Sequence, residues 1–346
     1  MHRGFLVVAS ALVVVIALAP FAFAGGGKET PEPTTLAIAS TPANPSQGDY
    51  KAGADAFGKK AGFPVVDVLV KGLPDIVAEV ARMGGNVVFF IDPSQDSDDA
   101  AIVQILEQDG VYFVTWGAKP VDLKVWSYPH WVAHISFDAV AAGYSAATEL
   151  FKAFATPHQG KILAIQGPAA AARSTESFQG LQKALSENTG VQLVQSVSGD
   201  WGRISAYNET RGLLATHPEI DGIWCANDEM ALGAIQALKE AGLAGKVMVS
   251  GIDGAPEMLQ AVKAGTAAAT VMNDAKYRAG LGLAMSIAAK QGRLDVAAQP
   301  HTYRQFDITD VSVTKANIDQ VIRDYVESTP DYDFSDFYAR WSAAIP

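Results

Sequence analysis

The chain has 346 residues, of which 49% are hydrophobic, 18% are charged and 9% are aromatic. This composition can form a large apolar core and excludes a disordered or fibrous chain, and the length favours two domains. The formal net charge of −11 argues against nucleic acid and anionic membrane surfaces as partners. The single cysteine, Cys225, excludes a disulfide framework, and its apolar neighbours predict a packing role.

The N-terminus has the layout of a secretory signal peptide. Two residues, His2 and Arg3, precede an apolar run at 5–23 that ends in a small-x-small cleavage pattern. We therefore expect residues 1–24 to be removed and the mature chain to be periplasmic. The alternative is a membrane anchor, because the run approaches spanning length. Residues 25–33 are rich in glycine, proline and charge, which predicts a flexible leader.

Short apolar runs then alternate with helical patterns. Strands are expected at 35–40, 65–70, 86–91 and 111–115, and helices at 49–61, 73–83 and 97–108. Repetition of strand, helix and strand at this interval predicts a parallel sheet that is covered by helices on both faces.

The same alternation begins again near residue 139. Helices are expected at 139–154, 175–187 and 229–241, and strands at 161–165, 191–197, 222–225, 247–251 and 267–272. The predicted fold class is α/β, with two doubly wound parallel-sheet lobes and a cleft between them. Ligands of such sheets gather beyond the carboxyl ends of the strands.

Polar and aromatic residues follow these strands. They include Asn44, Ser46, Gln47, Trp116, Gly117, Arg173, Trp201, Asn227, Asp253 and Asn273. Amide, carboxylate and guanidinium groups can contact neighbouring hydroxyls, and an indole face can cover the C–H surface of a ring. The mixture therefore suits a sugar.

Each of these residues also has a structural interpretation. Asn227 can cap the helix at 229–241, and Asp253 can cap a turn. Trp116 and Trp201 can be packed core residues. Their joint position at strand ends is what favours a ligand site.

Around Asn227 the sequence resembles a known family. The block Asn-Asp-Glu-Met-Ala-Leu-Gly-Ala at 227–234, with Ser-Gly-Ile-Asp-Gly at 250–254 and Ala-Ala-Thr-Val at 268–271, is similar to the ribose-binding-protein group of periplasmic sugar-binding proteins. The effector domains of sugar-responsive repressors share the first block. The resemblance runs over about residues 36–295. It implies a type I periplasmic binding protein fold, in which two lobes joined by a three-strand hinge close over one sugar.

The resemblance also implies domain boundaries. The N-terminal lobe would contain 34–137 and 274–302, and the C-terminal lobe 138–273 and 303–346, with crossings near 137–138, 273–274 and 303–306. Residues 318–346 continue past the usual end of the family. Their aromatic residues predict a C-terminal extension that packs onto a lobe and braces the hinge region.

Several ligand positions of the family carry suitable side chains here. These are Asn44, Trp201, Asn227, Asp253 and Asn273, the last where ribose binders have glutamine.

Three departures change the expected ligand. Ser46 and Gln47 replace paired phenylalanines, and Trp116-Gly117 replaces an aspartate-arginine pair. Ser177 replaces an arginine, for which Arg173, four residues earlier, can offer a substitute guanidinium. The scaffold is thus kept while the ligand differs from ribose, and another pentose, a hexose or a linear polyol remains open.

These features predict the extracytoplasmic binding subunit of a carbohydrate ABC transporter. We expect a monomer that delivers a monosaccharide or polyol to a membrane permease, without enzymatic activity or a cofactor. One alternative is a sensor that presents the ligand to a chemoreceptor or histidine kinase. A repressor is disfavoured by the signal peptide, and an enzyme by the lack of a dinucleotide fingerprint or a nucleophile elbow.

Two patterns that resemble metal sites are discounted. His130 and His134 have the spacing of a helical metal pair, but their flanks alternate as a strand, which separates the imidazoles. The acid-rich segment 92–99 lacks the spacing of a calcium loop. We therefore expect no bound metal.

Overall fold

The computed structural model describes residues 34–40, 46–69, 73–83, 85–91, 99–117, 119 and 122–344. The predicted signal peptide, the leader, Asn44 and all of the acid-rich segment except Asp99 lie outside these residues. Within them, no helix combines the length and the apolarity needed to cross a bilayer.

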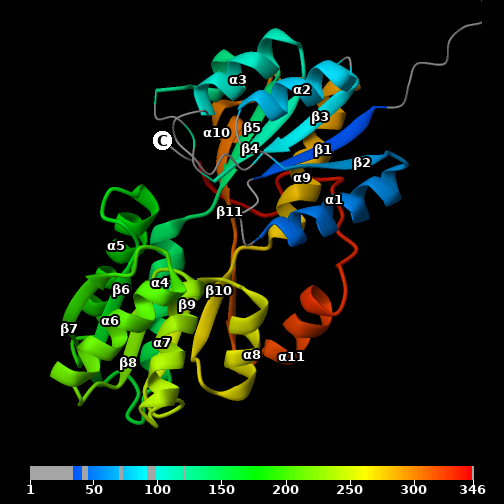
Figure 1. Cartoon of the computed structure of the whole chain (residues 1–346). Coiled ribbons are helices and arrows are strands. Elements are labelled where there is room, and N and C mark those ends of the chain that lie inside the picture. The colour runs from blue at the N-terminus through cyan, green and yellow to red at the C-terminus, as the bar shows by residue number, and fades with distance from the viewer. Residues whose placement is uncertain are drawn as a thin grey trace, which may run out of the picture. The chain divides into compact units, whose positions relative to one another are not determined.

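The first lobe is built on a seven-stranded sheet with the order β13-β11-β5-β4-β3-β1-β2 (Figure 1). Its strands are β1 (Thr35–Ser40), β2 (Val65–Leu69), β3 (Val87–Ile91), β4 (Phe113–Trp116), β5 (Trp131–Ser136), β11 (Gln305–Ile308) and β13 (Trp341–Ala344). Its helices are α1 (Gln47–Ala61), α2 (Leu73–Met83), α3 (Asp99–Gln108), α9 (Ala275–Lys290) and α10 (His301–Arg304), with a short 3-10 turn at Val125–Ser127. All strand pairs are parallel except β11 with β13.

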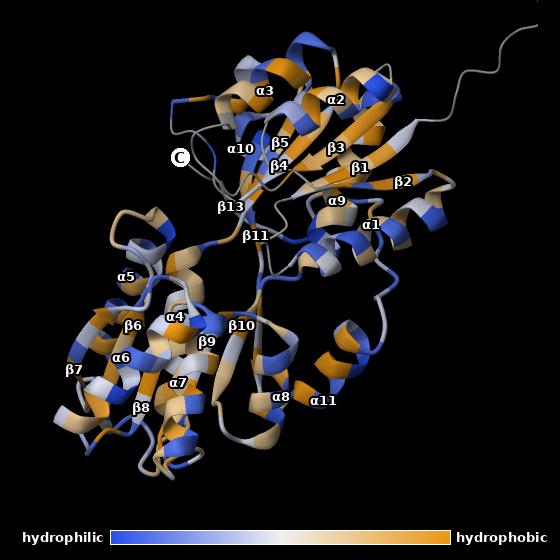
Figure 2. Cartoon of the chain, in the orientation of Figure 1, coloured by the Kyte–Doolittle hydropathy of each residue, from blue (hydrophilic) through white to orange (hydrophobic). Residues whose placement is uncertain are grey.

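Helices cover both faces of this sheet, with α1 and α9 on one face and α2 and α3 on the other (Figure 1). Alternation along β3 explains the arrangement. Val88 and Phe90 join the apolar core under α1 and α9, whereas Phe89 and Ile91 join the core under α2 and α3. Because both faces are buried, β1 and β3 are hydrophobic along most of their length (Figure 2).

The second lobe is built on a six-stranded sheet with the order β12-β10-β9-β8-β6-β7. Its strands are β6 (Gly160–Gln166), β7 (Val191–Ser198), β8 (Gly222–Cys225), β9 (Met248–Asp253), β10 (Ala269–Met272) and β12 (Val311–Thr314). Its helices are α4 (Ala139–Lys152), α5 (Ala172–Glu187), α6 (Arg203–Thr216), α7 (Asp228–Glu240), α8 (Pro256–Ala264) and α11 (Ile318–Val321), which continues into a π-helix at Ile322–Val326. Only the pair β10–β12 is antiparallel.

The predicted fold class is confirmed. The orders β2-β1-β3-β4-β5 and β7-β6-β8-β9-β10 are both doubly wound, and each reverses beside its first strand. Cys225 is fully buried in β8, as its apolar neighbours predict.

The chain passes between the two sheets at Phe137–Asp138, at Asn273–Asp274 and at Thr309–Asp310. The sequence predicts the third passage near 303–306 and assigns 303–346 to the second lobe. That assignment is wrong for β11 and β13, which both lie in the first sheet. Strand β11 pairs with β5, and β13 covers the edge that β11 would otherwise leave unpaired.

Candidate functional site

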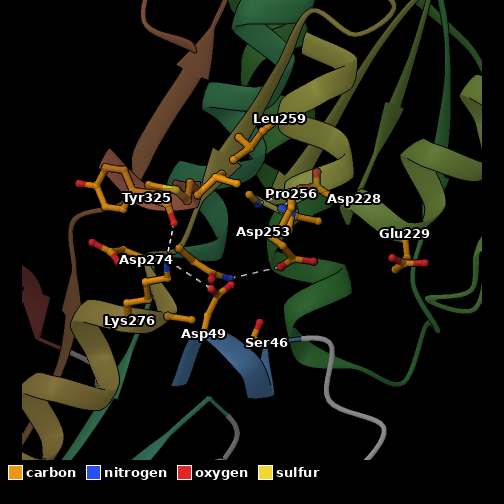
Figure 3. Close-up of a pocket in the computed structure, with 16 residues that line it drawn as sticks. Ser46, Asp49, Asp228, Glu229, Asp253, Pro256, Leu259, Asp274, Lys276 and Tyr325 are labelled. Carbon is orange, nitrogen blue, oxygen red and sulfur yellow. Dashed lines mark hydrogen bonds and ion pairs between the residues drawn. The ribbon is translucent and has the colours of Figure 1, made fainter. Parts of the chain in front are cut away.

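A pocket of about 130 Å³ lies at the carboxyl ends of β9 and β10 (Figure 3). Three of the residues predicted from the sequence border it, namely Ser46, Asp253 and Asn273. The other lining residues are Asp49, Asp228, Glu229, Gly254, Ala255, Pro256, Leu259, Met272, Asp274, Ala275, Lys276, Tyr325 and Val326. Polar side chains thus meet where the topology of a doubly wound sheet favours a ligand.

Asp253 is held in an unusual conformation at the end of β9. Its φ is 133°, which a residue with a Cβ rarely adopts, and strain of this kind costs about 1–3 kcal/mol. Its Oδ1 accepts a hydrogen bond of 3.2 Å from Nδ2 of Asn273. In Figure 3, Asp253 and Ser46 lie on facing sides of the pocket. The surrounding structure therefore fixes the direction of the Asp253 carboxylate.

Asp228 supports the turn that follows Asp253. This buried carboxylate begins α7 and accepts hydrogen bonds from the backbone N–H groups of Gly254 and Ala255, at 2.8 and 2.7 Å. It also accepts one from Oγ1 of Thr270, at 2.8 Å. Three donors from β10 and from the turn after β9 thus hold one carboxylate behind the pocket wall.

The pKa values of both carboxylates are raised above the ordinary range. Burial raises the pKa of Asp228, and the nearby charge of Asp253 raises it further. Burial also raises the pKa of Asp253, while the charges of Arg173 and Arg278 act in the opposite direction. The charges of two arginines, on α5 and α9, thus partly offset the effect of burial on the pKa of Asp253.

Lys276 closes another side of the pocket. Its Nζ donates to the backbone carbonyls of Tyr325 and Ser328, the latter at 3.1 Å, and lies 3.8 Å from the carboxylate of Asp49. Only 8% of Lys276 is exposed. This side chain joins the first turn of α9 to the π-helix and to the start of α1.

The corresponding edge of the first lobe is sealed by aromatic rings. Trp116, at the end of β4, stacks on Phe137 with 5.9 Å between the ring centroids. The guanidinium of Arg278 lies 3.5 Å from the centroid of Trp116, on an indole that is only 2% exposed. Trp116 is therefore packed in the interior and does not expose its indole face to a ligand. This is the core-packing alternative given for Trp116 in the sequence.

Arg278 is the most buried charge at this edge and is not among the site residues predicted from the sequence. It extends from α9, is fully buried and forms an ion pair of 2.9 Å with Asp310. Burial lowers the pKa of Arg278 to about 10, and Asp310 opposes that shift. Its Nε and Nη1 have no hydrogen-bond partner among the described residues.

A family model described as a periplasmic binding protein domain matches residues 88–294. The chain belongs to this family. The family resemblance predicted from the sequence is thereby confirmed. The pocket at the ends of β9 and β10 lies within the matched residues for most of its lining.

Individual members support the same relationship. The D-allose-binding periplasmic protein of Escherichia coli is 34% identical over 163 residues, which is 47% of this chain and 52% of that protein. The ribose import binding protein RbsB of Escherichia coli is 29% identical over 243 residues, or 69% of this chain and 78% of its own. The solved twin-arginine translocation pathway signal protein from Burkholderia phytofirmans has a TM-score of 0.81 and 35% identity, with 91% and 99% of the two chains covered.

Asn227 and Trp201 lie together at the edge of the second lobe in this periplasmic binding protein. Oδ1 of Asn227 accepts a hydrogen bond from the Met230 N–H at 2.8 Å and so caps α7. Its Nδ2 donates to the carbonyl of Trp201 at 3.3 Å. The indole of Trp201 packs on Gly167, where an added Cβ would come within 2.3 Å of the ring. Neither side chain borders the pocket.

Three further predicted residues lie elsewhere. Gln47 donates from Nε2 to Oδ2 of Asp67 at 3.2 Å, within the first lobe. Gly117 has a φ of 84° and donates its N–H to the carbonyl of Ile135. Arg173 is half-buried, with its guanidinium 5.6 Å from the ring centroid of Phe137. The charge of Arg173 acts to lower the pKa of Asp253.

Ser177 serves helix packing. Its hydroxyl donates to the carbonyl of Ser174 at 3.2 Å, and its backbone lies against Gly143 of α4. A Cβ at Gly143 would lie 2.0 Å from the Ser177 carbonyl oxygen, and one at Gly180 of α5 would lie 2.1 Å from the Val140 carbonyl oxygen, so each helix needs a glycine at this contact. Ser177 is buried and its hydroxyl bonds within α5, and it does not border the pocket.

The two histidines of the metal-like pattern make separate contacts. Nδ1 of His130 lies 2.7 Å from a carboxylate oxygen of Glu107, and Nδ1 of His134 lies 2.9 Å from Oγ1 of Thr115. Across the part of the chain that the structure describes, no group of three or more histidine, cysteine or acidic side chains is placed to hold a metal ion.

A sequence signal for Arg278 and Lys276 exists. Both interrupt a helix, 275–290, that is otherwise composed mainly of small and apolar residues and is buried along almost its whole length. A charge in such a helix must be paired inside the fold, because an unpaired buried charge is costly.

Proposed function

We propose that this chain is an extracytoplasmic solute-binding protein that captures a monosaccharide or polyol and delivers it to the permease of an ABC transporter. The observation that carries the proposal is the hydrogen-bonded pair of Asp253 and Asn273 beside a pocket, in a chain of the periplasmic binding protein family. Relatives named for D-allose and ribose support a ligand of this class.

The chemistry of the pair suits hydroxyl groups. The Asp253 carboxylate accepts hydrogen bonds, whereas the Asn273 amide can both donate and accept. A hydroxylated ligand can satisfy both groups, while an apolar analogue would leave them unpaired and would be rejected. The strained backbone of Asp253 keeps its carboxylate directed before the ligand arrives.

Capture requires no chemical step. A ligand that binds the closed arrangement of the lobes better than the open one shifts the protein towards closure, a hinge motion typical of periplasmic binding proteins. The permease would then recognise the ligand-bound form. Polar groups at the end of the second sheet and at the start of α1 would provide the difference in affinity.

A thermal-shift screen tests this proposal. The mature protein is heated with pentoses, hexoses, deoxy sugars and polyols, after dialysis to remove any co-purified ligand. One class of compound should raise the melting temperature saturably, by about 2.7 kcal/mol of stabilisation at a hundredfold excess over Kd. Uptake of the same labelled compound should fall in cells that lack the gene. A flat screen would contradict sugar capture, and unchanged uptake would contradict delivery to a permease.

A further inference from the structure

The C-terminal segment makes a fourth connection between the two lobes. After β12 in the second sheet, α11 packs on α8 and passes into the π-helix, and β13 then pairs with β11 in the first sheet (Figure 2). We call residues 327–344 the C-terminal strap. Three passages at 137–138, 273–274 and 309–310 already join the sheets, so the strap is additional to them.

The start of the strap is held by Lys276. The last turn of a helix leaves carbonyl groups without intrahelical donors, and a cation near that end is favourable. The Lys276 Nζ fills this role, because it donates to the carbonyls of Tyr325 and Ser328. A residue of the pocket wall thus holds the point at which the chain leaves the second lobe.

The middle and the end of the strap converge on Asp274. The hydroxyl of Tyr332 donates to Oδ1 of Asp274 at 2.7 Å, and Nη1 of Arg340 forms an ion pair with Oδ2 at 2.7 Å. The Arg340 guanidinium also lies 3.9 Å from the centroid of Tyr277. Only 4% of the Asp274 side chain is exposed, so the interaction is shielded from solvent.

Aromatic packing keeps the strap in place. Phe334 contacts α9 at Gly280, where an added Cβ would lie 2.6 Å from the ring. Tyr338 stacks on Tyr303 with 4.2 Å between centroids, and its hydroxyl donates to Gln299 at 3.0 Å. The strap is therefore docked on the first lobe by contacts that are independent of Asp274.

Asp274 connects the strap to the pocket. It directly follows Asn273, whose amide holds Asp253, and its Oδ1 accepts the Tyr277 N–H that begins α9. The passage from β10 to α9 is thus held by two sets of contacts. Asn273 bonds to Asp253 at the pocket, and Asp274 bonds to residues of the strap.

We propose that Arg340 and Tyr332 are positioning residues of the ligand site, and that the strap sets ligand affinity by fixing the passage at Asn273–Asp274. This inference rests on the proposed function. Arg340 does not border the pocket, so any effect on binding must travel through the residues it contacts, of which Asp274 is its ion-pair partner.

Two variants of the strap test the inference by calorimetric titration of the best compound from the screen. Arg340→Met removes the ion pair to Asp274 and keeps a side chain long enough to lie on Tyr277. Tyr338→Phe is the matched control, because it removes one hydrogen bond of the strap away from the passage. We expect Arg340→Met to weaken binding by about tenfold, typical of coupling between linked sites, and Tyr338→Phe to leave Kd unchanged. An unchanged Kd in Arg340→Met, or equal losses in both variants, would overturn the proposal.

Hydrogen exchange provides a readout that needs no ligand, so the inference can fail separately from the proposed function. The Tyr277 amide should exchange faster in Arg340→Met than in the wild type or in Tyr338→Phe, because its acceptor, Asp274, loses the ion pair that helps to hold it in place. Equal exchange in all three proteins would overturn the proposal. If Arg340→Met does not fold, Tyr332→Phe removes only the hydroxyl to Asp274 and is judged by the same two measurements.

Discussion

The two lobes present very different strand ends. In the second lobe, Asp228, Asp253 and Asn273 form a hydrogen-bonded polar edge that borders the pocket. In the first lobe, Trp116 and Phe137 form an apolar stack that is covered by the guanidinium of Arg278. Equivalent positions of two similar sheets have therefore taken different roles, one suited to a ligand and the other to packing.

The difference shows that topology alone does not make a site. A doubly wound sheet brings the ends of its strands together in both lobes. What distinguishes the two edges is how their charges are used, since Arg278 is paired with Asp310 whereas the carboxylate of Asp253 remains at the pocket. Four changes test this contrast.

The largest effect is expected at the sealed edge. Arg278→Met would leave Asp310 buried without its counter-ion, and the loss of one partner of such a pair costs about 3–5 kcal/mol. Urea denaturation should show this loss, and the double variant with Asp310→Asn should recover part of it. Arg293→Met, at an exposed arginine on the same lobe, serves as the control and should have a wild-type midpoint. An unchanged midpoint in Arg278→Met would show that the Arg278–Asp310 pair does not stabilise the first-lobe edge, and the difference between the two edges would then not hold.

The next effect concerns the polar edge. Asp253→Ala should weaken ligand binding by about 1–3 kcal/mol, because ligand hydroxyls lose a buried acceptor. The free energy of unfolding should not fall by a comparable amount. Burial disfavours the charged form of Asp253, as its raised pKa shows, so the carboxylate itself adds little to stability. Asp55→Ala, an exposed carboxylate on α1 paired with Lys51, is the calorimetric control. Equal affinities in the two variants would exclude Asp253 from the site.

A pH dependence is expected from His134 in β5. Burial lowers the pKa of this imidazole to about 3, and the charges of Lys119 and Arg173 add to the shift. The unfolded chain therefore binds a proton below about pH 6.5 that the folded chain does not, so stability is lost as the pH falls from 6.5 towards 3. This loss amounts to at most about 1.4 kcal/mol per pH unit. His134→Gln should show a shallower slope between pH 6.5 and 4.5 than the wild type, and parallel slopes would argue against this role.

The smallest effect is expected at Asn227. Loss of the cap in Asn227→Ala should cost about 1 kcal/mol of stability, whereas Asn227→Ser should retain most of it, because serine also caps helices. Ligand affinity should change less than in Asp253→Ala, since Asn227 does not border the pocket. Denaturation and titration of both variants measure the two quantities. A loss of affinity as large as that of Asp253→Ala would assign Asn227 to the ligand instead.

Local sequence patterns located most of the regular elements and three of the residues that border the pocket. The strands 35–40 and 222–225 and the helix 73–83 have the predicted bounds, because apolar periodicity and flanking glycine, proline and polar residues are local signals. Asp253 and Asn273 follow from the rule that ligands gather at the carboxyl ends of parallel strands. For Asn227, the capping alternative describes the observed contacts.

The return of the C-terminal segment to the first lobe could not be predicted from local sequence patterns. Strands β11 and β13 are four residues each, and their pairing joins positions more than thirty residues apart. Such short segments have little pattern of their own, and the place of β13 depends on the edge of β11 and on the contacts of the strap with α9.

By itself, the sequence determined the α/β class, the two doubly wound lobes, the family and the Asp253–Asn273 edge. Each of these depends on the order of the elements and on residues at fixed places in that order. Only the tertiary structure decided that Arg278 seals Trp116 and that Arg340 reaches Asp274, because these contacts join side chains distant in sequence. Both contacts depend on which elements pack against each other in the folded chain. A local pattern of residues does not specify that packing.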